Sequence, residues 1–168
     1  MNIHELIKTR RSVRAYQDKA IPEDVLERVL ESARWAPSAR NLQPYRFVLV
    51  KDEGQRRQLA AAAREQMFIA QAPVVVVAVA TDPERVFTCG VHGYAVDVSI
   101  AVDHLSLAAV GEGLGNCWIA AYDQEKVAEL VGLAEGEKVV VIMPLGYAAD
   151  EAPPDRERKG LGKLVSEL

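Results

Sequence analysis

Residues 36–45 gather a serine, an arginine, an asparagine and a glutamine around two prolines. Core packing does not require such a mixture, whereas loops carried by a rigid scaffold are the usual place for binding side chains. The amides of Asn41 and Gln43 each offer a hydrogen-bond donor and an acceptor, which suits the edge of a flat heterocycle. The alternative is a turn punctuated by proline, and this segment alone does not decide between the two.

A second cluster of polar side chains lies near the start of the chain. Arg10, Arg11 and Arg14, together with Ser12, place three guanidiniums and a hydroxyl within five residues. Such a group can surround a phosphate, because the arginine fork matches two phosphate oxygens at once. The alternative is a basic last turn that complements the dipole of a helix over residues 3–8. That alternative accounts for Arg10 and Arg11 better than for Ser12 and Arg14.

The composition limits the classes of protein to consider. With 49% hydrophobic and 26% charged residues, the chain has an ordinary globular composition, and its 168 residues suit a single domain over residues 1–168. The formal net charge of −4 argues against a general nucleic-acid or membrane-surface partner, because such binders present a basic surface. We therefore interpret the arginine cluster as a local site within an acidic protein.

The cysteines and histidines do not predict a metal site. Cys89, Cys117 and three scattered histidines lack metal-ligand spacing, and free thiols suit a reducing cytoplasm. The chain does not open on a basic and then apolar leader, so we expect a cytoplasmic protein. Residues 96–114 are apolar but include acidic residues that are costly in lipid, which predicts a buried helix and not a membrane span.

Hydrophobic periodicity predicts the elements that position these clusters. Helices are expected over residues 3–8, from Pro22 to before Pro37, from an Asp52 cap through residues 59–63, over residues 92–110 and after an Asp123 cap. Strands are expected over residues 45–50, 74–79, 116–121 and 139–143, with a loop over residues 81–90. Trp35, Phe47 and Trp118 are expected in the core. Helices on both faces of a small sheet predict a layered α+β or α/β domain.

Four motifs resemble the nitroreductase family of FMN enzymes in both order and spacing, over about residues 3–165. They are Arg10-Arg11-Ser12-x-Arg14, Pro37-Ser38-x-x-Asn41-x-Gln43-Pro44, Gly113-Leu114-Gly115-x-Cys117-Trp118-Ile119 and Pro144-Leu145-Gly146-Tyr147. The resemblance implies the α+β alternative, a three-layer fold whose mixed, mostly antiparallel central sheet is flanked by helices. It also implies an intertwined homodimer in which the tail, residues 150–168, packs on the partner subunit.

The resemblance further implies that FMN binds at the dimer interface. The cofactor-binding residues it indicates are Arg10, Arg11, Ser12 and Arg14 at the phosphate and ribityl chain; Pro37, Ser38, Ala39, Asn41 and Gln43 from the other protomer; Gln66; Ile119, Ala120 and Ala121 at the ring edge; and Arg156, Arg158 and Lys159 of the tail. Which two of the three tail cations contact the phosphate stays open. Arg40, Phe68, Tyr94 and Tyr122 are candidates for the substrate side, and each could equally be a packing residue.

The function that the resemblance implies is that of an FMN-dependent NAD(P)H oxidoreductase. Hydride would pass through flavin N5 in a ping-pong cycle to a small nitroaromatic, quinone or similar electron-poor acceptor, with no catalytic side chain. Two alternatives remain: a non-enzymatic FMN-binding or storage protein, and a metabolite-specific flavin dehydrogenase or dehalogenase on the same scaffold. A hydrolase pair of Asp97 with His92 or His104 is not supported, because the chain has no Gly-x-Ser-x-Gly elbow.

Overall fold

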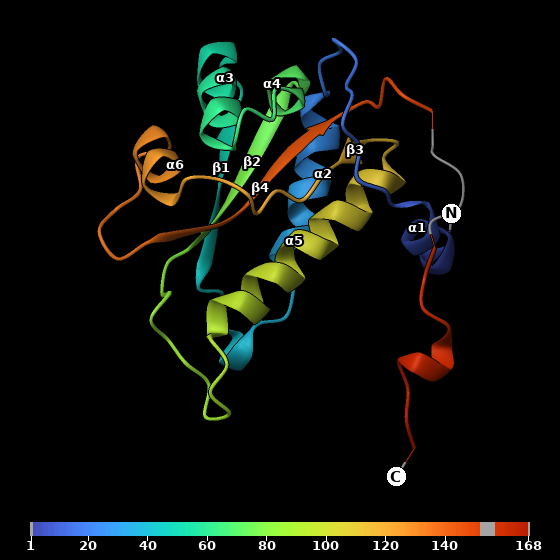
Figure 1. The fold of residues 1–168 in the computed structure, drawn as a ribbon, viewed down its shortest axis with the longest axis vertical. Helices are drawn as coiled ribbons and strands as arrows, with labels where there is room; N and C mark the ends of the chain where they lie inside the picture. The colour runs from blue at the N-terminus through green and yellow to red at the C-terminus, as the bar shows by residue number, and fades with distance from the viewer. Residues whose placement is uncertain (1, 152–156, 168) are drawn as a thin grey trace.

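The computed structural model describes residues 2–151 and 157–167, and Figure 1 shows the arrangement of their elements. In chain order the elements are α1 (Ile3–Thr9), α2 (Glu23–Arg34), the short 3₁₀ helix η1 (Ala39–Asn41), β1 (Tyr45–Val50), α3 (Glu53–Ala62), α4 (Phe68–Gln71), β2 (Val74–Ala80), α5 (Gly93–Gly111), β3 (Gly115–Asn116), α6 (Gln124–Leu130), β4 (Lys138–Gly146) and the 3₁₀ helix η2 (Leu161–Lys163). Most of the predicted elements are therefore present.

The strands form one four-stranded sheet in the order β1-β2-β4-β3. All three neighbouring pairs are antiparallel, and the β2–β4 register shifts between Ala78 and Val79. A single parallel bridge between Ser12 and Asn116 adds the N-terminal segment beside β3. This bridge makes the sheet mixed but mostly antiparallel, so the predicted α+β class is confirmed.

Two hydrophobic cores lie on opposite faces of this sheet. Val76 of β2 belongs to the core with α2 and α5, which includes the fully buried Leu105. The next residue, Val77, belongs to the core with α3, α4 and α6, which includes Leu59. Successive side chains of a strand point to opposite faces, so a strand buried on both sides must be apolar throughout. All seven residues of β2 are buried, as its unbroken apolar sequence predicts.

Side-chain caps fix the starts of two helices where the sequence predicts them. The Asp52 carboxylate accepts a hydrogen bond from the Gln55 amide at 2.8 Å, and α3 follows. The Asp123 carboxylate accepts one from the Lys126 amide at 3.2 Å, and α6 follows. Each cap satisfies a backbone N–H that has no partner within the helix.

Helix α5 is long and apolar enough to pass a length-and-composition test for a membrane span. In the structure it packs as a core helix against α2 and against β1, β2 and β4. Its first turn lies at one end of the molecule and its last turn lies beside α1 at the other, as Figure 1 shows. This helix sets the distance between the segments at its two ends.

The strand predicted over residues 116–121 is wrong in extent. Strand β3 ends at Asn116, and the segment meets β4 again at a single bridge between Ile119 and Ile142. Because Asn116 pairs with Leu145, both contacts belong to the same antiparallel register. The strand pairing is thus interrupted, but the two segments keep the same alignment on both sides of the interruption.

Pro144 explains the interruption. Ile119 and Ile142 exchange two backbone hydrogen bonds, of 2.9 and 3.1 Å. The next hydrogen-bonded pair of an antiparallel ladder lies two residues along, at Cys117 and Pro144, and proline has no N–H to donate. The Pro144 carbonyl instead accepts a hydrogen bond from the Tyr16 hydroxyl at 3.3 Å. The proline therefore opens the sheet edge beside the segment that follows the arginine cluster.

One predicted core residue is also misplaced. Trp35 is 72% exposed, whereas Phe47 and Trp118 are partly buried against the α2–α5 core as expected. Trp35 is the C-cap residue of α2, where its indole N–H donates to Glu31 at 2.9 Å. The Arg34 guanidinium lies 4.8 Å from its ring centroid, so the indole is held on the surface by polar neighbours.

Both ends of the described chain present apolar side chains to solvent. Helix α1 has no buried residue, and Ile3 and Ile7 are about half exposed. Leu161, Leu164 and Val165 are exposed in the tail, which lies on the same side of the molecule as α1 in Figure 1. Exposed apolar side chains at both ends of the chain can contribute to an interaction surface.

Candidate functional site

The arginine segment is fixed by backbone contacts to β3. The Val13 amide donates to the Asn116 carbonyl at 2.9 Å, next to the parallel bridge made by Ser12. The approach requires glycine at position 115, because a Cβ there would lie 2.5 Å from Val13 Cγ2 and 2.9 Å from its Cβ. The arginine segment and β3 thus form one rigid substructure.

Asn116 holds this substructure against α5. Its side chain is fully buried, its Oδ1 accepts from the Ser106 hydroxyl at 2.8 Å, and its Nδ2 donates to the Ser106 carbonyl at 3.0 Å. A buried amide with both ends satisfied fixes one arrangement of the elements it joins. Asn116 was not among the predicted site residues, and the only signal for it was an asparagine inside an apolar run.

The three arginines of this segment have different surroundings. Arg14 is exposed, and its guanidinium forms no hydrogen bond or ion pair with another described residue. Arg10 is half-buried, and electrostatic attraction from both Arg10 and Arg14 acts on the nearby Cys117 thiol. Of the two, Arg14 is the side chain whose exposed charge suits an incoming anion.

Arg11 has another partner in the structure. Its guanidinium makes bidentate hydrogen bonds to the Asp150 carboxylate, of 2.9 and 3.0 Å, and a third to the Asp150 carbonyl at 2.9 Å. Arg11 holds the pKa of this carboxyl below its usual range. Because its fork is occupied, the structure favours Arg11 as the anchor of the tail's first residue over its predicted contact with the cofactor.

The Ser12 side chain lies over a buried thiol. It lies close to Cys117, whose side chain is almost fully buried. Burial raises the pKa of the Cys117 thiol, although the nearby arginines and the Ser12 side chain oppose the shift. The thiol stays neutral at neutral pH and supports Ser12 from below, while the hydroxyl can still serve an external acceptor.

The loop over residues 37–43 has a strained backbone. Arg40, Asn41 and Gln43 have positive φ values of 57°, 56° and 49°, in the region that favours glycine. The Ser38 hydroxyl accepts from the Gln43 amide at 2.9 Å, and the Gln43 side chain donates to the Asn41 carbonyl at 3.0 Å. Gln43 thus closes the loop on itself, and Asn41 is left exposed.

The segment predicted at the ring edge keeps only part of its donors. The Ile119 amide is used by β4, but the Ala120 and Ala121 amides donate to no other described residue and both residues are exposed. Gln66 lies next to them, because its Nε2 donates to the Ala121 carbonyl at 3.3 Å and to Ala63 at 2.8 Å. Two backbone N–H groups without a described acceptor and the Gln66 side chain therefore lie close together.

The candidate substrate-side residues are partly used in packing, and of the four only Tyr94 and Tyr122 lie close to each other among the described contacts. Phe68 packs beside both the α3–α4–α6 core and Tyr16, and the Tyr122 hydroxyl donates to the Val139 carbonyl at 3.0 Å. Burial raises the pKa of Tyr122 to about 12, so this phenol is not an acid or base at neutral pH. Tyr94 lies under Lys138, and Arg40 is exposed on the strained loop.

The predicted tail cations are only partly described. Arg156 lies outside the described residues. Arg158 and Lys159 are exposed, and an Arg158 nitrogen donates to the Glu157 carbonyl at 3.0 Å. Within the described residues neither cation forms an ion pair, and no hydrogen bond joins either of them to the arginine segment.

Within one chain the two halves of the predicted site lie at opposite ends of α5. The Ala39 amide, in the 37–43 loop, donates to Asp97 in the first turns of the helix at 3.1 Å. The arginine segment lies beside the last turns, because Asn116, which forms a bridge with Ser12, bonds to Ser106 of the helix. The helix between positions 97 and 106 is about 14 Å long at a rise of 1.5 Å per residue.

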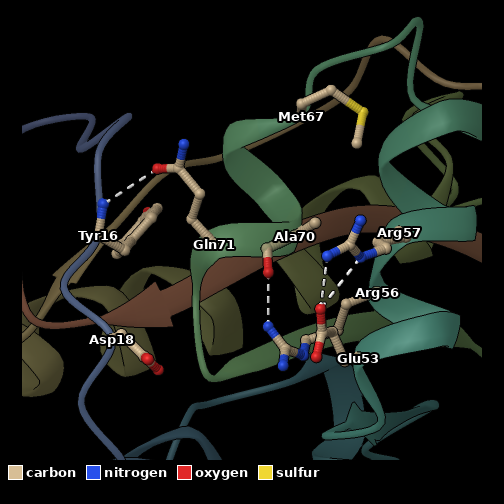
Figure 2. Close-up of a pocket in the computed structure, with 8 residues that line it drawn as sticks. All are labelled: Tyr16, Asp18, Glu53, Arg56, Arg57, Met67, Ala70 and Gln71. Atoms are coloured by element: carbon tan, nitrogen blue, oxygen red, sulfur yellow. Dashed lines mark hydrogen bonds and ion pairs between the residues drawn. The ribbon is translucent and has the colours of Figure 1, made fainter.

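A separate cavity of about 430 Å³ lies between the N-terminal segment, α3 and α4. Figure 2 shows its lining of Tyr16, Asp18, Glu53, Arg56, Arg57, Met67, Ala70 and Gln71, none of which is a predicted site residue. Its two guanidiniums are already paired: Arg56 donates to the Ala70 and Ala72 carbonyls, and Arg57 pairs with Glu53. Arg56 therefore anchors the end of α4, the helix that follows Gln66. The cavity has no free cation among the described residues.

These features define a layered α+β protein that combines an exposed arginine–hydroxyl segment with a loop of amide donors. A family model described as the nitroreductase family matches residues 7–90 and 68–147. The chain is 31% identical over 176 residues to the NADH dehydrogenase of Thermus thermophilus, covering 86% of each chain. It is 30% identical over 175 residues to the FMN reductase [NAD(P)H] of Bacillus subtilis, covering 94% of this chain and 69% of that protein.

A solved structure extends the likeness to three dimensions. The NADPH:FMN oxidoreductase of Vibrio harveyi, in complex with NAD⁺, superimposes with a TM-score of 0.89 at 27% identity and covers 99% of this chain and 77% of that one. The chain belongs to the nitroreductase family.

Proposed function

We propose that this protein is an FMN-dependent NAD(P)H oxidoreductase that reduces small electron-poor acceptors. The observation that carries the proposal is the rigid arginine segment: Arg14 is exposed and has no hydrogen bond or ion pair within residues 2–151 and 157–167, and Ser12 is held beside it by β3. In a member of this family such a donor set fits the FMN phosphate. The names of the relatives, which include an FMN reductase and an NADPH:FMN oxidoreductase, support the same activity.

Each group of residues has a distinct part in the proposed site. Arg10, Ser12 and Arg14 bind the phosphate, and the Ala120 and Ala121 amides donate to the polar edge of the ring. Bound FMN supplies two-electron chemistry, accepting hydride from NAD(P)H and reducing the second substrate in a ping-pong cycle. The described side chains then bind, orient and exclude water, and no side-chain base is required. The cytoplasm, which is rich in NAD(P)H, is the proposed location.

We also propose a homodimer with two shared sites. Asn41 lies on the loop held at the first turns of α5, and the arginine segment lies beside its last turns, so one chain does not place them together. A second copy can bring the loop of one chain to the arginines of the other, as the C2 symmetry of most dimers allows. The exposed apolar residues of α1 and of the tail, including Ile7 and Leu161, supply surface for such an interface.

The first experiment is an anaerobic visible spectrum of the purified protein reconstituted with FMN. We expect the flavin absorption to bleach on addition of NADH or NADPH and to return with a nitroaromatic or a quinone. Flavin that stays oxidised with both nicotinamides would instead support an FMN-storage protein. A protein that binds no FMN at all would contradict the proposed function.

Mixed dimers test the shared site. When chains carrying Arg14→Ala are combined with chains carrying Asn41→Ala, one site of each heterodimer has both defects and the other has neither. We expect each homodimeric variant to bind FMN weakly and each heterodimer, purified through two different affinity tags, to bind one FMN tightly. Heterodimers that bind no FMN tightly would show that Arg14 and Asn41 serve the same chain's site, or that one of them serves none.

A further inference from the structure

A buried carboxylate underlies the strained loop. Asp97, in the first turns of α5, is 1% exposed, and its Oδ1 accepts a hydrogen bond from the Ala39 amide at 3.1 Å. Ala39 begins the short helix η1, whose N-cap residue, Ser38, uses its hydroxyl for Gln43 and not for the helix. Asp97 therefore supplies, from a different element, an acceptor for the first backbone N–H of η1.

The second oxygen of this carboxylate faces another loop. Asp97 Oδ2 lies 3.6 Å from a guanidinium nitrogen of Arg85, too far for a hydrogen bond but close enough for an ion pair. Arg85 is itself fixed, since its carbonyl accepts from the Gly93 amide at 2.8 Å and its guanidinium lies over Phe87. One carboxylate thus contacts both the 37–43 loop and the 81–92 loop.

The surroundings of Asp97 are unusual for a residue that only stabilises the core. Its Oδ2, Arg85 Nη1 and the Tyr45 hydroxyl are all buried without a hydrogen-bond partner among the described residues. Buried polar groups are nearly always paired, and leaving them unpaired costs free energy of folding. Asp97 keeps two contacts at this cost, the ion pair with Arg85 and the hydrogen bond from Ala39. The hydrogen bond is made to the loop that carries Asn41.

We propose that Asp97 is a positioning residue for FMN: through the Ala39 amide it holds the strained 37–43 loop of its own chain in the conformation that presents Asn41 to the FMN of the partner subunit. The proposal rests on the proposed function and on the shared site. Three non-glycine residues with positive φ make this loop costly to maintain, so an external contact is needed to keep it in one conformation. Asp97 does not touch the cofactor in this scheme.

The experiment uses the full chain with Asp97→Ala, Asp97→Asn and, as a matched control, Asp103→Asn. Asp103 lies on the same helix and is exposed, so its variant removes the same charge without touching the loop. FMN affinity is measured by quenching of flavin fluorescence, and loop order by hydrogen exchange of peptides covering residues 36–45. We expect Asp97→Ala to weaken FMN binding about tenfold and to raise exchange in these peptides. Asp97→Asn keeps an acceptor for Ala39 and should recover most of the affinity.

Mixed dimers separate positioning from general stabilisation. If Asp97 acts through its own chain's loop, Asp97→Ala belongs with Asn41→Ala: combined with Arg14→Ala chains it restores one tight site per dimer, and combined with Asn41→Ala chains it restores none. A merely structural loss weakens both sites of the dimer and restores none in either combination. That pattern, or an Asp97→Ala homodimer with wild-type FMN affinity, would overturn the proposal.

Failure of the shared site is recognised separately. It is seen when Arg14→Ala and Asn41→Ala chains themselves fail to complement each other, whatever Asp97 does. In that case hydrogen exchange still reports on the loop. Unchanged exchange over residues 36–45 in a folded Asp97→Ala protein would then overturn the positioning role without reference to FMN.

Discussion

The two halves of the proposed site are built in opposite ways. The arginine segment has ordinary backbone geometry and is fixed by the sheet: Val13 donates to Asn116, and Gly115 permits close packing. The 37–43 loop has three strained residues and is fixed at its start by one buried carboxylate, that of Asp97. The first half is stabilised by the core of the protein, whereas the second depends on a few specific hydrogen bonds.

This difference indicates that the arginine segment is the rigid half of the site and the 37–43 loop the adaptable half. A phosphate group is the same in every flavin mononucleotide, so a rigid cradle fixed to the core suits it. A loop held by few contacts can shift at lower cost, because segments with few buried apolar contacts open more readily than core elements. We therefore expect substitutions that disturb the backbone packing of the first half to affect folding and binding together, and those that loosen the second half to affect mainly binding.

The largest expected effect is at Gly115, on the rigid side. Gly115→Ala places a Cβ within 3 Å of two Val13 carbons, so the arginine segment or β3 must move. We expect a loss of about 2–3 kcal/mol in the free energy of unfolding, measured by urea denaturation of the apoprotein. Gly111→Ala is the control, because its Cβ would meet Leu6 at an ordinary 3.6 Å. Equal stability of the two variants would contradict the rigid arrangement.

Charge removal in the same segment should affect binding without affecting folding. Arg14→Ala should weaken FMN binding by about 10- to 100-fold, the range for losing one charge-assisted contact. Arg57→Ala, which removes an exposed arginine paired with Glu53 on α3, is the control and should not change FMN affinity. Arg11→Ala should change it less than about threefold, since Asp150 already occupies that guanidinium. If Arg11 mattered more than Arg14, the two assignments would have to be exchanged.

The strain of the loop can be measured through glycine. Arg40 is exposed with a φ of 57°, so Arg40→Gly should relieve a strain of about 1 kcal/mol and offset the entropic cost of glycine. Arg57→Gly, in the middle of α3, should instead destabilise the protein by about 1 kcal/mol. Thermal unfolding of both variants gives the contrast. A similar loss at the two positions would mean that the loop is not strained in solution.

The smallest expected effect lies outside both halves. Arg46 of β1 makes two hydrogen bonds to Glu137, of 2.7 and 2.5 Å, and lowers the pKa of that carboxyl to about 2. Because the folded-state pKa is below the unfolded one, the pair stabilises the protein above about pH 4.5 and is lost as pH falls toward 2. Glu137→Gln should cost about 0.5–1 kcal/mol at pH 7 and less at pH 3, by urea denaturation, with unchanged FMN affinity. A constant cost across that pH range would rule out the ion pair as its source.

Local sequence patterns were sufficient for most of the fold. Helix α2 and strand β2 follow from periodicity, and the caps at Asp52 and Asp123 follow from local chemistry, because each depends on residues a few positions apart. The extent of β3 did not follow, since its interruption is caused by Pro144 on the neighbouring strand. A single sequence does not show which residue will lie opposite Cys117.

The site shows the same limit. The motifs located the arginine segment and the 37–43 loop, but two of the contacts that hold them were not predicted. Arg11 meets a residue 139 positions away, and Asp97 reaches an amide 58 positions away. In the sequence Asp97 was considered only as a partner for histidine. Burial of its carboxylate against a backbone N–H is visible only after α5 and the loop have been placed.

The position of the two half-sites at opposite ends of α5 has a genetic consequence. If each site is completed by two chains, two defective alleles can rescue each other when one damages the arginine segment and the other damages the loop. Random pairing of the two products makes half of the dimers mixed, each with one sound site, so a cell carrying both alleles keeps about a quarter of its sites. Two alleles damaged in the same half would give none, and a simple growth selection could therefore map every residue to its half.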